Sequence, residues 1–319
     1  MRSSKLQELR RNGRSIRISG GTGFVGRALC GALRQVGYKV FVVSRTPEGP
    51  DMMTWSDVRR HGLPTNCKAV VNTAGENIFN VKKKWTEDFQ QEVITSRLYT
   101  TSVLAKAING AEKKPEAFVC MSGVGYYKPS QTAEYTEESP GGDFDFLSEL
   151  STNWEKCSEL KPEAKEVRRV IIRSGIVLGR QGGVIRDMYF PFYFGVGGPV
   201  GSGQQFFPWI HINDIVGLIL FAIENNKVKG VLNGVAPQAV TNREFATALG
   251  KAMWRPSLFP LPKFVLNVIF SPERAKIMTE GQKVIPKRAL EYGFTYDYPD
   301  IDSACRACAH LTYTEHGIY

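Results

Sequence analysis

The feature that most constrains this chain is a glycine-rich segment near its amino end, Gly20-Gly21-Thr-Gly23-Phe-Val-Gly26. A β-prone run, 16–19, leads into it, and a helical pattern that stops at Gly37 leaves it. In such a strand–turn–helix, glycines allow a tight turn, close approach to a pyrophosphate and close helix–strand packing. Registers beginning at Gly20 and at Gly21 both fit. The alternative to a dinucleotide site is an ordinary tight turn that needs glycine only for its backbone conformation. A second β-prone run, 39–44, follows at the distance expected in a dinucleotide-binding unit and favours the dinucleotide site.

The residues after that second run indicate which nicotinamide cofactor fits. A site for NAD usually places Asp or Glu here, to accept hydrogen bonds from the ribose 2′-hydroxyl. This chain has Ser44 and Arg45, and its first acid, Glu48, follows Pro47. A guanidinium group pairs with a 2′-phosphate, although an arginine that merely ends a strand is the alternative. The sequence favours NADP(H).

The order of predicted elements indicates the fold class. The chain of 319 residues is 42% hydrophobic, enough for one large domain or two intimate ones. Further strands are expected at 52–55, 68–72, 117–122 and 169–173, with helices at 86–111, 146–160 and 215–224. We expect an α/β protein, with a Rossmann-type doubly wound parallel sheet and a smaller, mostly helical C-terminal lobe on the substrate side. The expected divisions are a basic leader (1–15), an NADP-binding core (16–180) and a partly interleaved substrate-side region (181–319).

The formal charge of +10 is concentrated near the amino end. An arginine-rich, acid-poor leader is typical of a mitochondrial transit peptide, and equally of a disordered tail. The expected location is intracellular, with the cytoplasm and the mitochondrial matrix both open. Beyond the leader, Lys82–Lys84 is the basic run, and no aromatic platform accompanies it, so no nucleic-acid partner is expected. No run of 18 apolar residues is present, so no membrane span is expected.

The six cysteines are scattered along the chain, which suits reduced thiols in an intracellular protein. Cys305 and Cys308 form the one suggestive pair. The pair has neither a second pair for zinc nor a preceding strand for a redox motif. We therefore predict a plain terminal helix there and no metal site.

Longer motifs carry a family resemblance that covers the chain from about residue 16 onward. They include the glycine segment, Val43-Ser-Arg, Asn72-Thr-Ala-Gly-Glu-Asn, Arg173-Ser-Gly-Ile-Val-Leu-Gly and Phe207-Pro-Trp-Ile-His-Ile-Asn-Asp. With these motifs the chain resembles an extended short-chain dehydrogenase/reductase of the NAD-dependent epimerase/dehydratase superfamily. It is most similar to the atypical epimerase family proteins, a group once mislabelled cell-division-inhibitor-like.

This resemblance implies a Rossmann-type sheet, an NADP-type cofactor and an oxidoreductase or epimerase-like role on an unknown small molecule. The alternative is an NADP(H)-binding sensor or scaffold without turnover, and a homodimer is left open. By position, the family's cofactor contacts fall on Gly20, Gly23, Phe24, Val25, Gly26, Ser44, Arg45, Thr73, Ala74, Glu92, Arg97 and Val177. Glu92 and Arg97 are five residues apart, too far for a good intrahelical pair, so buried partners or a ligand are expected for both. The chain departs from the family in its leader and in Arg17, where the first strand should be apolar.

The usual proton-transfer pair of this family, Tyr-x-x-x-Lys, is absent. Alignment places its two positions at Leu147 and Ser151, which cannot move a proton in the same way. Ser122, Tyr126 and Tyr127 are the nearest hydroxyls, but a tyrosine without a cationic neighbour keeps a pKa near its ordinary value of about 10. The catalytic residues are therefore unknown, and weak activity on ordinary alcohols and ketones is expected.

His211 is one of four histidines and follows a short β-prone run. A structural role at the end of a strand is favoured over general-base catalysis. Asn213 or Asp214 is expected to cap the helix that follows.

Overall fold

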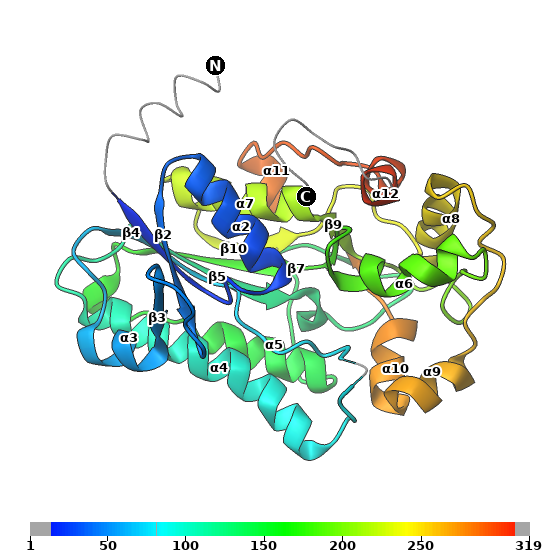
Figure 1. Cartoon of the computed structure of the whole chain (residues 1–319), viewed down its shortest axis with the longest axis horizontal. Coiled ribbons are helices and arrows are strands. Elements are labelled where there is room, and N and C mark those ends of the chain that lie inside the picture. Colours follow the sequence, from blue (N-terminus) through cyan, green and yellow to red (C-terminus); the bar gives the residue numbers. More distant parts are fainter. Residues whose placement is uncertain (1–13, 81, 310–319) are drawn as a thin grey trace.

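The computed structural model describes residues 14–80 and 82–309. Seven parallel strands form its main sheet, in the order β10-β7-β5-β4-β1-β2-β3 (Figure 1). They are β1 (Ser15–Ser19), β2 (Lys39–Ser44), β3 (Met52–Thr54), β4 (Cys67–Asn72), β5 (Ala117–Gly123), β7 (Arg168–Ser174) and β10 (Gly230–Gly234). The strand order runs outward from β1 in both directions, which defines a doubly wound sheet and confirms the predicted fold class.

Helices cover both faces of this sheet. α2 (Phe24–Gln35) and α7 (Ile212–Glu224) pack together on one face, and α11 (Lys287–Glu291) lies beside β10. The other face carries α3 (Trp55–His61), α4 (Glu87–Gly110) and α5 (Phe146–Cys157). Because α7, β10 and α11 come from the second half of the chain, that half completes the core sheet as well as building the lobe.

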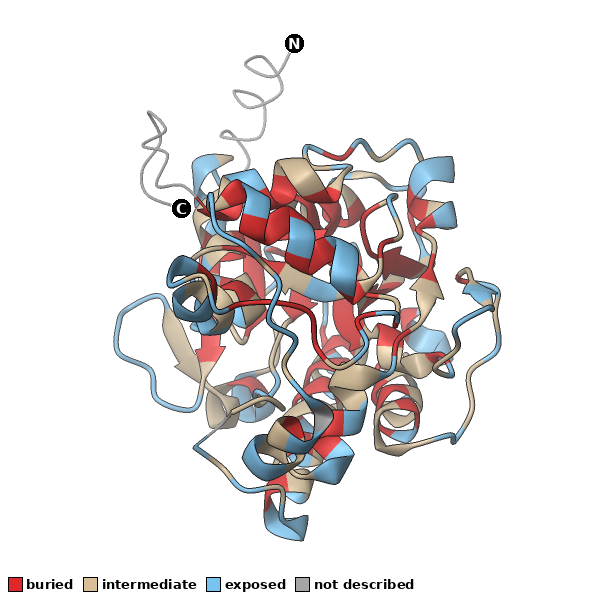
Figure 2. Ribbon diagram, turned by 90° about the vertical axis from the view of Figure 1, so that its right-hand side faces the viewer, coloured by how far each residue is buried: buried red, intermediate tan, exposed pale blue. Residues whose placement is uncertain are grey.

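Local sequence explains these elements. All six residues of β4 are buried, as expected for a central parallel strand covered on both faces. On α2 the buried residues include Leu29 and Leu33, one turn apart on a single face. Asp145 begins α5 through a capping box with Ser148. Figure 2 shows the result: buried residues fill the sheet and the helix faces turned toward it.

The first strand accommodates Arg17 in its buried interior. Its side chain is 7% exposed, and its guanidinium lies 4.0 Å from the centre of the Phe41 ring. Nε and Nη1 of Arg17 have no hydrogen-bond partner among residues 14–80 and 82–309, and burial lowers the pKa of this arginine. The strand begins at Ser15, which pairs with Lys39, so the last residue of the expected leader belongs to the sheet. Residues 1–13 lie outside the described residues.

The remaining helices form the lobe on the right of Figure 1. They are α6 (Gly183–Tyr193), α8 (Asn242–Ala252), α9 (Lys263–Phe270), α10 (Pro272–Thr279) and α12 (Ile301–Ala309). A second apolar core joins α8 and α12, with Trp209 and Phe245 among its buried side chains. Two short strand pairs, β8–β9 (Ile176–Leu178, Trp209–His211) and β6–β11 (Glu134–Tyr135, Lys283–Val284), lie outside the main sheet. The 3-10 turns η1 (Val124–Tyr126) and η2 (Pro162–Ala164) follow β5 and α5 within the core.

Candidate functional site

The glycine segment forms the turn between β1 and α2. Gly20 has φ +73°, and a Cβ there would lie 2.6 Å from the backbone nitrogen of Ala74. A Cβ on Gly26 would lie 2.0 Å from the carbonyl oxygen of Gly20, so only glycine fits at either position. Gly26 belongs to both registers, and a Cβ on Gly21 would lie 2.7 Å from Val42 Cγ2, so the turn requires glycine in either register.

The helix start is open to an anion. Gly23 is the N-cap of α2, and no side chain caps the helix there. The first backbone N–H groups of a helix have no intrahelical partner, and the helix dipole favours negative charge near them. Phe24, Val25 and Gly26 supply these N–H groups. The turn is therefore suited to the pyrophosphate of a dinucleotide.

A buried polar network fixes the neighbouring end of β4. Asn72 donates through Nδ2 to Thr101 Oγ1 (2.7 Å), and its Oδ1 accepts from the Ala74 N–H (3.0 Å). The Thr73 hydroxyl donates to the carbonyl of Ser19 (2.8 Å). Thr73 is thus held beside the glycine turn by its bond to β1, and Ala74 by its bond to the Asn72 side chain.

The end of β2 presents Ser44 and Arg45. Ser44 Oγ accepts from the backbone N–H of Thr46 (3.2 Å), which shapes the turn after the strand. Arg45 is exposed, and it makes no ion pair within the described part of the chain. The position therefore offers a cation with unused hydrogen-bond donors and no carboxylate.

Glu92 and Arg97 do not contact one another, as their spacing indicated. Both carboxylate oxygens of Glu92 accept from Lys83 Nζ at 2.7 Å. Arg97 donates to the carbonyls of Val93 (3.1 Å) and Glu76 (3.0 Å), and burial lowers its pKa to about 10. Arg97 therefore positions the loop after β4, and Glu92 lies in an ion pair at the edge of the same loop.

Val177 and Phe24 meet through a glycine-rich segment. Val177 lies in β8, and a Cβ on Gly183 would be 2.9 Å from the Val177 carbonyl oxygen. A Cβ on Gly179 or Gly182 would lie within 2.8 Å of the Phe24 ring. The segment after β8 therefore packs on the first turn of α2, and the predicted positions gather at the carboxyl edge of the sheet.

Leu147 and Ser151, the two positions that the resemblance aligns with the proton-transfer pair, both lie on α5. A Cβ on Gly125 would be 2.9 Å from Cβ of Leu147, and one on Gly123 would be 3.7 Å from Ser151 Oγ. Both positions on α5 therefore face the end of β5. An apolar side chain and a buried hydroxyl occupy them.

Sequence reasoning missed a buried network beside this point. Arg173 forms a two-pronged ion pair with Glu155 (2.8 Å for both bonds) and donates to the Tyr127 hydroxyl (2.9 Å). Tyr127 donates to Asn233 Oδ1 (2.8 Å), and Ser122 donates to Glu155 (2.9 Å).

The expectation that neither tyrosine has a cationic neighbour is wrong. The Arg173 guanidinium lies 3.3 Å from the Tyr126 ring centre and 5.1 Å from that of Tyr127. Burial nevertheless raises the pKa of Tyr127, because desolvation outweighs the favourable effect of Arg173. The arginine at the end of β7 was visible in the sequence, but its partners come from other elements.

His211 has the structural role that the sequence favoured, and the predicted cap is wrong. Its Nδ1 accepts from the Asn213 N–H (3.2 Å), so His211 itself caps α7. Burial lowers its pKa to about 4. Asp214 instead accepts from the backbone N–H groups of Asp297 (2.7 Å) and Tyr298 (3.1 Å). Burial raises the pKa of Asp214 to about 6.

The described residues contain no group of three or more His, Cys, Asp or Glu side chains that could hold a metal ion. No helix in the same ranges is long and apolar enough to cross a membrane. The six cysteines are free, and Cys305 and Cys308 are buried on α12, which is the plain helix that was predicted.

Comparisons with known proteins agree with the fold and the glycine turn. The model of the NAD dependent epimerase/dehydratase family matches residues 16–148, and a domain of unknown function (DUF1731) matches residues 261–308. Human epimerase family protein SDR39U1 is 52% identical over 291 residues, which cover 91% of this chain and 98% of the human one. A chloroplastic homologue from Arabidopsis thaliana is 37% identical over 305 residues, covering 92% and 86% of the two chains.

A solved structure shows the same arrangement. The crystal structure of human SDR39U1 (isoform 2), determined with NADPH, matches with a TM-score of 0.90 and 50% identity. The match covers 92% of this chain and 99% of the human one. The fold and glycine turn are those of the NAD-dependent epimerase/dehydratase class of short-chain dehydrogenases/reductases. Within that class, the chain belongs to the SDR39U1 family of epimerase family proteins.

Proposed function

We propose that this protein binds NADP(H) and acts as an oxidoreductase, of the epimerase-like type, on a small molecule that is not yet identified. The observation that carries the proposal is the open glycine turn at α2 combined with Arg45, an exposed cation, at the end of β2. The human relative's crystal structure with NADPH supports it.

Each group of residues has a distinct task in this proposal. The turn from Gly20 to Gly26 holds the pyrophosphate through backbone N–H groups. Arg45 meets the 2′-phosphate, and a guanidinium group can contact phosphate through two parallel hydrogen bonds. Thr73 and Ala74 hold backbone beside the cofactor ribose. A bound nicotinamide would supply hydride chemistry at the carboxyl edge of β4 and β5.

Cofactor binding is tested by thermal shift with NADP, NADPH, NAD and NADH. A ligand at about 100 times its Kd stabilises the protein by roughly 2.7 kcal/mol. Arg45→Ala should erase the preference for the phosphorylated cofactors and leave residual binding through the glycine turn. Arg34→Ala is the matched control, because Arg34 is exposed in the last turn of α2, at the opposite end of that helix from the glycine turn. Equal shifts with NAD and NADP in the unmodified protein would refute the assignment of Arg45.

A second candidate is an NADP(H)-binding sensor without turnover. The observation that favours it is the replacement of the proton-transfer pair by Leu147 and Ser151, next to a fully buried Tyr127. Incubation of the protein and deuterium-labelled NADPH with a cell metabolite extract separates the two candidates. Deuterium in a metabolite supports the oxidoreductase, whereas firm NADPH binding without transfer in extracts from several growth conditions supports the sensor.

A further inference from the structure

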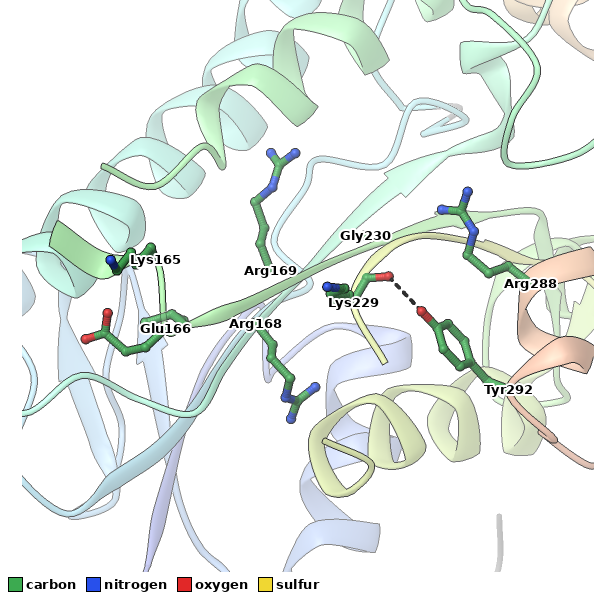
Figure 3. A pocket seen from close by; sticks show the side chains of 9 residues that line it. Lys165, Glu166, Arg168, Arg169, Lys229, Gly230, Arg288 and Tyr292 are labelled. Atoms are coloured by element: carbon green, nitrogen blue, oxygen red, sulfur yellow. Dashed lines mark hydrogen bonds between the residues drawn. The ribbon is translucent and has the colours of Figure 1, made fainter. Parts of the chain in front are cut away.

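A groove lies at the opposite edge of the sheet from the glycine turn. It has a volume of about 510 Å³ and is formed where β7 and β10 begin, next to α11 (Figure 3). Its lining residues are Lys165, Glu166, Val167, Arg168, Arg169, Lys229, Gly230, Arg288 and Tyr292. These residues come from three separate stretches of sequence, so the groove could not be predicted from a continuous run of basic residues.

The charge of this groove is unbalanced. Five cationic side chains line it, and Glu166 is the one acidic side chain among the lining residues. None of the five cations lies within 4.0 Å of a carboxylate in residues 14–80 and 82–309. Glu116 and Glu224 act on Arg168 only from farther away. A concave surface lined by one sign of charge concentrates its field and attracts ions of the opposite sign.

Backbone carbonyls hold the arginines in place. Arg169 Nη1 donates to the Glu155 carbonyl (3.1 Å) and to Ser158 Oγ (2.9 Å), at the end of α5. Arg288 Nη1 donates to the Val231 carbonyl (2.9 Å). In both Arg169 and Arg288, the atoms Nε and Nη2 make no hydrogen bond within the described chain, and these nitrogen atoms are not buried. Anchored guanidinium groups lose little side-chain entropy when a ligand takes the remaining N–H groups.

A glycine, Gly230, lines the groove together with Arg169 and Arg288. Gly230 has φ +79°, and a Cβ there would lie 3.5 Å from Arg288 Nη1. The Tyr292 hydroxyl donates to the carbonyl of Lys229 at 3.4 Å, the dashed line in Figure 3. Gly230 therefore has a backbone conformation that other residues rarely adopt, and the Tyr292 hydroxyl holds the carbonyl of the residue that precedes it.

We propose that this groove binds a compact polyanion of the polyphosphate class, at a site separate from the cofactor. Anchored arginines suit phosphate oxygens, since a guanidinium can contact two of them at once. The exposed Lys165 and Lys229 add point charges at the rim. A chain of two or three phosphates carries enough negative charge to balance the excess of cations, which a single carboxylate does not.

The test is isothermal titration of the full-length protein with sodium tripolyphosphate. Saturating NADPH is present throughout, so that the glycine turn cannot bind the probe. We expect saturable binding that weakens with added KCl. The double variant Lys165→Gln, Lys229→Gln should weaken it about tenfold or more, since each charged contact contributes on the order of a tenfold change.

The matched control is Lys251→Gln, Lys276→Gln, which removes the same charge from two exposed lysines on the lobe helices α8 and α10. Tripolyphosphate should bind this control as it binds the unmodified protein, and NADPH affinity should be unchanged in both double variants. An absence of binding in the NADPH-saturated protein would overturn the proposal. So would equal weakening in the two double variants, because a general charge effect would then explain the result.

Discussion

Lowering the pH from 7 to 5 should destabilise the protein through His211. The imidazole is 5% exposed and caps α7 with an unprotonated nitrogen, so the folded state resists protonation. Its pKa falls from an ordinary value of 6.5 to about 4. A base with a lowered folded pKa contributes stability that is present above the unfolded pKa and is lost as the pH falls toward the folded one.

The size of the effect follows from these two pKa values. Between pH 7 and pH 5, the contribution of His211 should fall by ~2 kcal/mol. Asp214 acts in the opposite direction, because its pKa is raised from 3.8 to about 6. Its folded state takes up a proton more readily, so the protein gains ~1 kcal/mol over the same interval. The two effects partly cancel in the unmodified protein, and a variant is needed to separate them.

His211→Asn provides that separation. Asparagine is a good N-cap and does not titrate, although the ring contact with Tyr298 is lost. Urea unfolding of both proteins at pH 5 and pH 7 gives the four free energies required. The stability difference between the two proteins should shift by ~2 kcal/mol in favour of the variant at pH 5. His61→Asn, at an exposed position, should show no such shift. A difference that does not change with pH would refute the reasoning.

Three further predictions concern other parts of the chain. Arg17→Met should raise the free energy of unfolding by about 1–2 kcal/mol in urea titrations, because two buried nitrogen atoms without partners in the described residues disappear while one cation–π contact is lost. A lower stability of the variant would contradict this account. Tyr127→Phe should cost about 1–3 kcal/mol and leave NADPH affinity unchanged, whereas Tyr126→Phe should abolish any hydride transfer at little cost in stability. Fusing residues 1–15 to a fluorescent reporter should show import into mitochondria if they act as a transit peptide, and a diffuse reporter would contradict that role.

Much of the core could be predicted from sequence because its signals are local. The glycine turn, the apolar strands and the helix periodicities each arise within a few residues. β10 escaped prediction for the same reason: its sequence, Gly-Val-Leu-Asn-Gly, has glycine at both ends and a polar residue inside. Only pairing with β7 makes it a strand.

The polar networks could not be predicted because they depend on contacts between distant elements. Arg173 meets Glu155 across 18 positions and Tyr127 across 46. The basic groove consists of 165–169, 229–230 and 288–292, and the pairing of β10 with β7 holds the first two of these segments side by side. Sequence pattern indicates which face of an element is buried, and it does not indicate which polar side chains meet there.

The hydrogen bonds of the hydroxyl groups near the end of β5 determine which of them could take part in turnover of a substrate. Ser122 is committed to Glu155, and Tyr127 to Asn233 and Arg173. The Tyr126 ring is held beneath the Arg173 guanidinium, whereas its hydroxyl has no partner in the described residues and is not buried. A fixed ring with a free hydroxyl is the arrangement that a general acid requires, once a substrate oxygen comes within about 3 Å. Tyr126 is therefore the hydroxyl in this part of the site that could pass a proton without dismantling the fold, and the separation of activity from stability between Tyr126→Phe and Tyr127→Phe follows from that difference.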